Sequence, residues 1–444
     1  MATSSVAPHD PAASRGISRQ TQSDIYRAGI SGQLPSVPTD PDRLAEAARK
    51  TLNPQAYAYI AGSAGGQHTA AANRAAFDRW QVWPRPLRDV AERDLSTTFL
   101  GTTRPHPLLL APLGVMEMAH PEADLAVARA AASMGASYTI SNQASAPLEK
   151  IAQAAPDAPR MFQLYWSASD ELNASLLARA EASGCEAIVV TVDTHLLGWR
   201  TRDLDLAYLP FTRGMGIAQY TSDPVFQQLV RDRVRVASEA PAAAEKVRIT
   251  PQTIAAGVSI ARHGAAVTGS RNLRENLRSP LPRTAVETFL DVFSTPSLTW
   301  NDLARARRWT TLPIIVKGIV HPDDAQQAID SGVDGIWVSN HGGRQVDRSV
   351  PTLDVLPSIV ETVNKRVPVV FDSGIRGGAD VAIALALGAD MVALGRPYAY
   401  GLALDGEEGV RSVIRHTLAE LDITLGLAGL TAIDQLDHGA LRQQ

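Results

Sequence analysis

Cysteine is almost absent from this sequence, since its 444 residues include only Cys185. A single cysteine excludes an internal disulfide and any metal or iron–sulfur site built from several cysteines. Long apolar runs are also missing, because no stretch approaches the roughly 18 apolar residues of a membrane span. The formal net charge of −4 gives no basic field to attract nucleic acid or a membrane surface. We therefore expect a cytoplasmic globular protein without a metal, nucleic-acid or membrane partner.

Lysine is scarce as well, because only five of the 42 basic residues are lysine and the rest are arginine. One of the five, Lys317, lies within a short apolar run, where a charged side chain is unusual. Lys317 is therefore a candidate functional residue.

The N-terminal segment has the composition of a tail. Residues 1–20 are rich in Ala, Ser and Pro and lack the apolar stretch of a secretory signal. We expect residues 1–23 to be disordered and the ordered domain to cover residues 24–444. The run Asp40-Pro41-Asp42 predicts a helix start, with a capping side chain and a proline in the first turn.

Eight short apolar runs that end in polar residues predict eight strands. They are residues 108–114, 137–143, 160–166, 187–193, 313–319, 335–342, 368–374 and 391–397. All but one of the intervals between them fit one strand–helix unit. The exception lies between the fourth and fifth runs, where residues 204–297 have weak helical periodicity. We interpret this segment as a long insertion, partly helical and partly mobile.

The segments between these runs carry helix signals. Pro or acidic residues open, and glycine closes, the segments 120–135, 167–184, 321–332 and 378–388. Eight strands that alternate with helices predict an α/β protein, a (β/α)8 TIM barrel with a long insertion after strand 4. A doubly wound sheet is the alternative, but the count of eight favours a closed barrel.

Polar residues concentrate at the predicted carboxyl ends of the strands, where such barrels hold their active sites. Residues 372–378 and 395–397 are glycine-rich loops that run toward helix starts, which indicates a phosphate-bearing ligand. His341 is a candidate proton acceptor, Asp193 its partner, Arg344 a carboxylate clamp and Lys317 a fixed positive charge. Each residue alone also has a structural interpretation, but the set together favours base-assisted chemistry beside a carboxylate.

Four motifs, at residues 162–165, 191–194, 339–345 and 372–378, resemble those of the FMN-dependent (S)-2-hydroxy acid oxidase and dehydrogenase family. The resemblance runs from about residue 26 to the C-terminus, apart from much of the insertion. It implies an FMN cofactor, a small 2-hydroxy acid substrate with O2, and a homotetramer or homo-octamer.

The resemblance also implies the site. The catalytic residues would be His341, Asp193, Arg344, Tyr165 and Lys317. Substrate-binding residues would be Tyr59, Arg344, Tyr165 and Arg200. The cofactor would contact Pro112, Leu113, Gly114, Ser141, Gln163, Thr191, Lys317, Ser339, Asp372, Gly374, Arg376, Gly395 and Arg396.

Two details point to the lactate 2-monooxygenase branch. Residues 209–216 and 221–227 resemble its extended loop, and Gly114 stands where most of the family has alanine. This branch converts L-lactate and O2 to acetate, CO2 and water. Gln143 departs from the tryptophan of glycolate oxidase, and residues 235–290 match no pattern of the family.

Three alternatives remain open from the sequence. The first is a 2-hydroxy acid oxidase that releases the 2-keto acid and H2O2. The second is an aldolase-like barrel that uses Lys317 as a Schiff-base nucleophile. The third is a flavin-binding barrel without activity, which the intact set of His341, Arg344, Asp193 and Lys317 disfavours.

Overall fold

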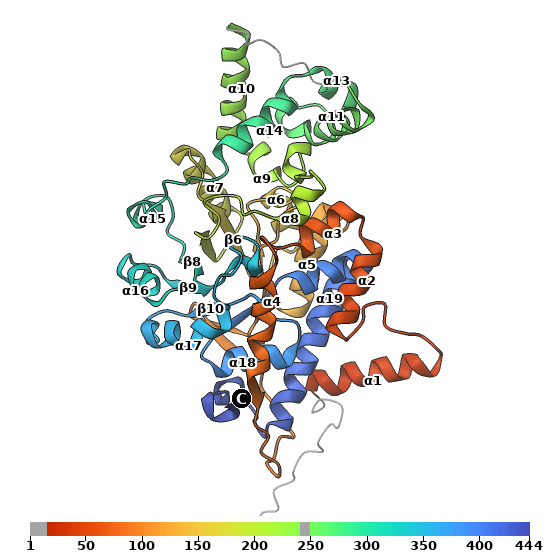
Figure 1. The fold of residues 1–444 in the computed structure, drawn as a ribbon, viewed down its shortest axis with the longest axis vertical. Helices are drawn as coiled ribbons and strands as arrows, with labels where there is room; N and C mark the ends of the chain where they lie inside the picture. The colour runs from red at the N-terminus through yellow and green to blue at the C-terminus, as the bar shows by residue number, and fades with distance from the viewer. Residues whose placement is uncertain (1–15, 240–248) are drawn as a thin grey trace, which may run out of the picture.

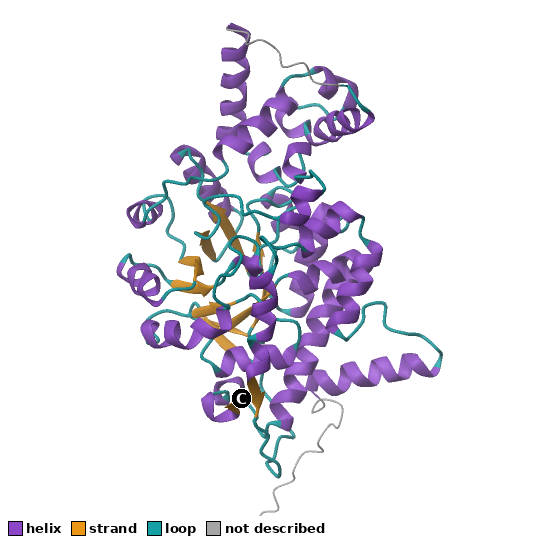
Figure 2. Ribbon diagram, in the orientation of Figure 1, coloured by secondary structure: helices purple, strands orange, loops and turns teal. Residues whose placement is uncertain are grey.

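A computed structural model describes residues 16–239 and 249–444. Eight parallel strands form a closed barrel in the order β10-β11-β4-β5-β6-β7-β8-β9 (Figure 2). Their bounds are β4 Leu108–Leu110, β5 Ser137–Ile140, β6 Arg160–Tyr165, β7 Ala187–Thr191, β8 Ile314–Ile319, β9 Gly335–Val338, β10 Val369–Phe371 and β11 Met391–Leu394. The predicted (β/α)8 barrel is confirmed, and each of the eight predicted runs contains one barrel strand.

Helices cover the outside of the barrel (Figure 1). They are α5 Ala123–Met134, α6 Leu148–Ala154, α7 Asp170–Ala182, α15 Trp300–Ala306, α16 Pro322–Asp330, α17 Thr352–Val363, α18 Gly378–Ala386 and α19 Arg396–Leu427. The predicted signals for helix starts and ends are present. Ser169 caps α7, His321 caps α16, and Gly135 ends α5 in the left-handed conformation at φ +69°.

The strands are buried on both faces, as a parallel barrel requires. Inward-facing side chains such as Leu109, Met161, Ile315 and Trp337 form one cluster inside the barrel. Phe99 joins this cluster from β2 Thr97–Phe99, which pairs with β3 Thr102–Arg104. Outward-facing side chains pack against the helices in a second, larger cluster. The interior is therefore a packed core that holds the strand ends in place.

Besides β2 and β3, the described chain before the barrel contributes four α-helices and one strand. These are α1 Gly16–Ile30, α2 Pro41–Thr51, α3 Pro54–Ala61, α4 His68–Ala75 and β1 Trp80–Val82, and β1 pairs with β12 Leu441–Gln443 near the C-terminus. The predicted helix start at Asp40 is confirmed, since its carboxylate accepts the Asp42 and Arg43 amides.

The expected start of ordered structure near Asp24 is wrong. Helix α1 begins at Gly16, because the backbone amide and hydroxyl of Ser18 both donate to Asp422 on α19, at 3.0 and 2.6 Å. Arg93 binds the same carboxylate. Residues 1–15 of the expected tail lie outside the described residues.

The insertion is helical where it is described. It contains α8 Thr201–Asp205, the 3-10 turn η3 Pro210–Arg213, α9 Ala218–Thr221, α10 Pro224–Glu239, α11 Pro251–His263, α12 Ala265–Thr268, α13 Leu273–Arg278 and α14 Leu281–Val292. Figure 1 shows α10, α11, α13 and α14 gathered at one end of the molecule, on top of the barrel. The expected mobile part includes residues 240–248, which lie outside the described residues.

Aromatic side chains tie the insertion together and to the barrel. Phe289 contacts Phe211, Tyr220 and Phe293, with ring centroids 4.8–5.2 Å apart. The end of α14 is fixed because the Val292 carbonyl accepts bonds from Ala168 and Ser167, in the loop after β6. The insertion therefore reaches the same edge of the barrel as the strand ends.

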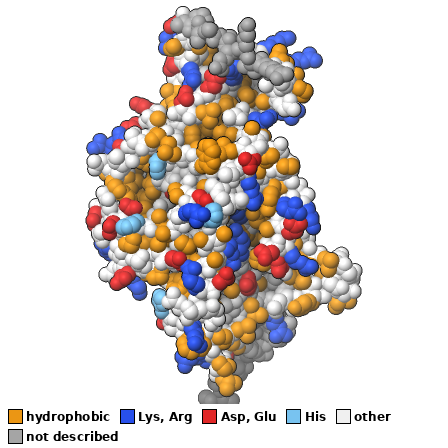
Figure 3. All heavy atoms as spheres, in the orientation of Figure 1, with side chains coloured by type: hydrophobic (Ala, Val, Ile, Leu, Met, Phe, Trp, Pro, Cys, Tyr) orange, Lys and Arg blue, Asp and Glu red, His pale blue; other side chains and the backbone are white. Residues whose placement is uncertain are grey.

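Within the described residues, none of the helices is both long and apolar enough to cross a membrane. Nor does this part of the chain bring together three or more His, Cys, Asp or Glu side chains in a cluster that could hold a metal ion. The face drawn in Figure 3 carries charged side chains of both signs, scattered among apolar ones.

Candidate active site

A cavity that is partly open to solvent lies at the carboxyl ends of the barrel strands. Every strand or the loop after it contributes to its wall. The lining residues from the barrel include Gly114, Gln143, Tyr165, Thr194, Lys317, His341, Arg344, Asp372, Gly395 and Arg396. Helix α3 adds Tyr59 and Ile60, and the insertion adds Phe211 and Phe293. The cavity is thus shared by barrel, N-terminal segment and insertion.

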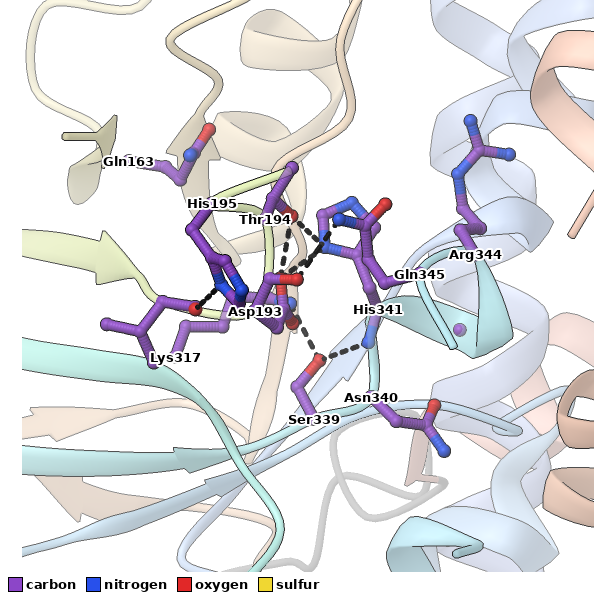
Figure 4. Close-up of polar contacts among 12 residues, drawn as sticks. Gln163, Asp193, Thr194, His195, Lys317, Ser339, Asn340, His341, Arg344 and Gln345 are labelled. Atoms are coloured by element: carbon purple, nitrogen blue, oxygen red, sulfur yellow. Dashed lines mark hydrogen bonds and ion pairs between the residues drawn. The ribbon is translucent and has the colours of Figure 1, made fainter. Parts of the chain in front are cut away.

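His341 in the cavity wall pairs with Asp193 behind it, and the two side chains are 17% and 11% exposed (Figure 4). The Nδ1 of His341 lies 2.8 Å from Asp193 Oδ1, and the Thr194 hydroxyl donates to the same oxygen at 2.8 Å. Burial opposes the charge of Asp193, but His341 and Lys317 together lower its pKa to about 2. Burial, with Lys317 and Arg200, lowers the pKa of His341 against the opposing effect of Asp193. His341 is therefore neutral at pH 7, with Nδ1–H directed to Asp193 and Nε2 free to accept a proton.

The loop that carries His341 is held by a network of short hydrogen bonds. His341 and Gly342 both have left-handed backbones, at φ +57° and +62°, within the turn η4 His341–Gly343. Asn340, just before, exchanges two 2.8 Å hydrogen bonds with Asn73 on α4. Ser373 accepts the Gly342 amide at 3.0 Å. The strained backbone at His341 is thus fixed from both sides, as is common at functional sites.

Arg344 lies beside Tyr59 at the edge of the cavity. Its Nη1 donates to the carbonyls of Tyr59 and Gly62 at 2.6 and 2.8 Å, and its guanidinium carbon lies 5.2 Å from the Tyr59 ring centroid. These bonds leave Nη2 and Nε for a ligand in the cavity. Arg200 packs behind, since it donates to the Arg344 carbonyl. Burial and the charges of Arg200 and Arg396 lower the pKa of Arg344 to about 9.

Arg376 and Arg396 extend this positive region. Burial and the neighbouring arginine lower the pKa of Arg376 to about 10, and burial also lowers the pKa of Arg396. Buried cations that repel one another are stabilised by bound anions. The arrangement therefore suits a carboxylate near Arg344 and a second anion near Arg376 and Arg396.

Lys317 occupies the centre of the strand ends. Its Nζ donates to the Ser339 hydroxyl at 2.7 Å and lies 3.3 Å from Asp372 Oδ2. Trp337 donates to the same carboxylate oxygen at 3.0 Å and places its ring 5.5 Å from the ammonium group. Lys317 is thus held as a cation that faces the cavity it lines.

The structure brings the whole set of residues predicted from the sequence to one end of the barrel. Those that line the cavity are Tyr59, Pro112, Leu113, Gly114, Tyr165, Arg200, Lys317, His341, Arg344, Asp372, Gly374, Arg376, Gly395 and Arg396. The others lie in the layer behind it, all of them buried or nearly so: Ser141, Gln163, Thr191, Asp193 and Ser339. Tyr165 stacks on His341 with ring centroids 6.5 Å apart, and burial raises the pKa of its phenol, which therefore stays protonated.

The residues present fit the expected FMN. Gln163 Nε2, Thr191 Oγ1 and Arg396 Nε are buried and have no hydrogen-bond partner among the residues that the structure describes. An unsatisfied buried polar atom costs about 1–3 kcal/mol, so these atoms match a polar ligand. Gln163 Oε1 accepts the Asn142 amide and the Ser141 hydroxyl, which leaves the amide nitrogen as the group that could donate to a ligand.

The starts of helices α18 and α19 differ in how well they could bind a phosphate. At the start of α18, the amides of Arg376 and Gly378 already donate to Asp380 and Glu420, at 2.8 and 2.6 Å. At the start of α19, Gly395 has no side-chain cap, and a Cβ there would meet open space. The start of α19, with the Arg376 and Arg396 side chains, is therefore the better cradle for a phosphate than the start of α18.

Sequence reasoning missed several residues of the site. Thr194, which bonds Asp193, stands next to it in the quoted motif and could have been found there. Asn73 and Trp337 carry no such signal, because they act through residues 267 and 35 positions away. Phe211 lies in the motif at residues 209–216, whereas Phe293, the residue that follows α14, lies outside every motif named above.

Comparisons with known proteins agree with this site. The profile of the FMN-dependent dehydrogenase family matches residues 48–443. An L-lactate oxidase of Lysinibacillus sphaericus is 38% identical over 421 residues, which are 94% of this chain and 95% of the relative. The 2-hydroxyacid oxidase 1 of Mus musculus is 36% identical and covers 89% of this chain and 94% of its own length.

Solved structures give the same result. Mandelate oxidase with (S)-4-hydroxymandelic acid superposes with a TM-score of 0.72 at 32% identity, over 92% of this chain and 99% of that one. The match covers the barrel and most of the remaining chain.

Proposed function

Because the chain belongs to the FMN-dependent dehydrogenase family, whose members here include 2-hydroxy acid oxidases, we propose that it oxidises L-lactate with O2 to acetate, CO2 and water. The observation that carries the proposal is the buried His341–Asp193 pair, which faces a cavity lined by cations. A neutral base next to cations that can bind a carboxylate suits a 2-hydroxy acid as the substrate.

His341 is the proton acceptor in this proposal. Its Nε2 takes a proton from the substrate during oxidation of the α-carbon, while Nδ1–H stays bonded to Asp193. The carboxylate of Asp193 then stabilises the imidazolium that forms. Both the oxidation as hydride transfer and the oxidation through a carbanion use the base in this place.

The remaining side chains hold the substrate and the cofactor. The free nitrogens of Arg344 bind the substrate carboxylate beside Tyr59, and the protonated phenol of Tyr165 donates to a substrate oxygen. Bound FMN supplies the acceptor for two electrons. Gln163 and Thr191 would contact its ring, Lys317 would offset the negative charge of its reduced form, and Arg376 and Arg396 would hold its phosphate.

Two features support the decarboxylating outcome. The cavity wall includes Phe211, Phe293 and Leu197, which come from the insertion and the loop before it, so these segments narrow the site. Gly114 packs closely on Gln143, and both line the cavity. A narrowed site retains pyruvate long enough for the H2O2 formed from O2 to react with it, which gives acetate, CO2 and water.

A second candidate is a 2-hydroxy acid oxidase that releases pyruvate and H2O2. The relatives favour it, because the bacterial relative at 38% identity is named L-lactate oxidase. The aldolase alternative is not carried further, since the family is FMN-dependent and Lys317 is committed to Ser339 and Asp372.

The products distinguish the two candidates. The purified holoenzyme is given L-lactate in air, and acetate, pyruvate and H2O2 are measured against the O2 consumed. The proposal predicts one acetate per O2 and almost no free peroxide. One pyruvate and one H2O2 per O2 would establish the oxidase instead.

We also infer a homotetramer or homo-octamer. The exposed apolar side chains Leu196, Trp199 and Leu204, which follow β7, support a further protein contact there. Light scattering of the purified protein tests this, and a monomer would contradict it. The cytoplasmic location stays a prediction, because the relatives include enzymes named as peroxisomal.

A further inference from the structure

Glu117 joins the barrel to two separate parts of the insertion. It lies in the turn η2 Met116–Met118, three residues after Gly114. One carboxylate oxygen accepts the backbone amide of Gly216 at 3.0 Å, and the other lies 2.8 Å from Nε2 of His263, the last residue of α11. No other acid among the residues described here spans from the β4 loop to both segments.

The hydrogen bonds of His263 require both of its ring nitrogens to be donors. Nε2 faces the Glu117 carboxylate, and Nδ1 lies 2.8 Å from the Ser259 carbonyl. The Ser259 carbonyl and an ionised Glu117 carboxylate only accept hydrogen bonds, so with Glu117 ionised the ring carries two protons and a positive charge. The charged pair is mostly buried, with 30% of the His263 side chain and 19% of the Glu117 side chain exposed.

The segment that Glu117 holds lies directly on the active-site wall. A Cβ at Gly216 would lie 2.5 Å from the Val115 side chain and 3.1 Å from the Gln143 carbonyl. The Val115 amide donates to that same carbonyl at 2.9 Å, and its own backbone is left-handed at φ +60°. Gly114 and Gln143 line the cavity beside these contacts. Only the backbone around Val115, Gln143 and Gly216 therefore separates Glu117 from the cavity, so a change at Glu117 should alter the cavity wall.

We propose that His263 and Glu117 form a charged clasp that positions the β4 loop and holds the insertion closed over bound substrate. They are positioning residues, because they act on the cavity through Val115, Gln143 and Gly216. The proposal depends on 2-hydroxy acid oxidation by this family and not on whether the product is later decarboxylated.

The charges around His263 give the clasp a defined pH dependence. Burial lowers the pKa of His263, but the hydrogen bond and charge of Glu117 outweigh it, and the net shift is upward despite Arg262. The other elements packed against α11 carry Arg213 on η3, Arg274, Glu275 and Arg278 on α13, and Arg283, Glu287 and Asp291 on α14. A raised pKa means that the clasp is intact below that pKa and is lost as pH rises through it.

The test is anaerobic reduction of the flavin in the holoenzyme, followed from pH 6 to 9 over a range of L-lactate concentrations. If L-lactate does not reduce the wild-type flavin, the 2-hydroxy acid that does is used. We expect His263→Gln and Glu117→Gln to raise the half-saturating concentration about tenfold at pH 6, as for loss of a charged hydrogen bond. The reduction rate at saturation should stay within about twofold, because His341 is untouched. Between pH 6 and 8, below the pKa of Arg344 at about 9, the half-saturating concentration of the wild type should rise with pH, whereas that of His263→Gln should not.

The matched control is Arg233→Gln. Arg233 pairs with Asp291 inside the insertion, so its loss removes an ion pair of the insertion, a more exposed one, without touching the barrel. It should leave the half-saturating concentration and its pH dependence unchanged. His263→Lys keeps a positive charge and should restore a low half-saturating concentration. The increase of this concentration with pH should occur at higher pH than in the wild type. If both Gln variants saturate as the wild type does, with the same pH dependence, the proposal is wrong. If His263→Gln yields no holoenzyme, Glu117→Gln decides alone.

Discussion

At the residue scale, the direction of proton transfer follows from the surroundings of His341. Its Nδ1 is bound to a carboxylate whose pKa is about 2, so Asp193 stays ionised at any pH where the protein functions. The imidazole therefore has one defined tautomer and one free nitrogen. Replacement of His341 by Gln should lower the rate of flavin reduction about 10²–10⁴-fold, the usual size of a general-base contribution. Retained FMN absorbance is the control for correct folding.

The Asp193–His341 pair also predicts a pH effect. The pKa of His341 is below its ordinary 6.5, so the rate should fall on the acid side, below about pH 6.5, as the base becomes protonated. Asp193 raises this pKa, so Asp193→Asn should move the acid limb to lower pH and also slow the reaction. The measurement is kcat/KM against pH for both proteins. An acid limb that moves to higher pH in Asp193→Asn would contradict this reading of the pair.

At the element scale, Gly114 and Gln143 link the ends of β4 and β5. A Cβ on Gly114 would lie 2.9 Å from the Gln143 Cβ, closer than normal contact, so one of the two loops must move. We expect Gly114→Ala to displace Gln143 and to shift the products toward pyruvate and H2O2. Gly257→Ala, in α11 with open space around it, is the control and should leave the products unchanged. Identical product ratios in Gly114→Ala and wild type would show that Gly114 does not determine the products.

Helix α1 gives a second prediction at this scale. Asp422 is buried and binds Arg93 and Ser18 together. Burial raises its pKa, but these partners outweigh burial and lower it, so their stabilising effect is lost only in acid. Asp422→Asn leaves Arg93 without its charge partner, at a cost of about 3–5 kcal/mol. The melting temperature of the holoenzyme should fall by several degrees. Asp24→Asn, which breaks an exposed pair within α1, should change it little, and equal shifts would contradict the argument.

The elements differ in how far they could be predicted from the sequence. The barrel strands were predictable because each is a short apolar run between helix punctuation. Helix α1 was not, because its anchor Asp422 lies 404 residues from Ser18. For the same reason the motif at residues 372–378 pointed to the start of α18, although Glu420, 42 residues away, already binds the Gly378 amide. The motifs predict which kinds of residue form the site, but they do not predict the distant residues that bind them.

At the scale of the whole molecule, the barrel supplies the reacting groups and the insertion supplies the cover. Phe211 contacts Tyr59 edge-on at 6.2 Å, and Phe289 connects Phe211 to α14. The aromatic cluster therefore runs from the carboxylate clamp into the helices that stand above the barrel in Figure 1. Closure of this unit over the cavity is what separates the two proposed product outcomes.

The most direct test of the account is the visible spectrum of the purified protein when L-lactate is added without oxygen. We predict that the wild-type protein is yellow and that its flavin bands bleach within seconds. The His341→Gln protein should stay yellow over the same time. A wild-type protein that binds FMN but keeps its full flavin absorbance with L-lactate would contradict the proposed substrate.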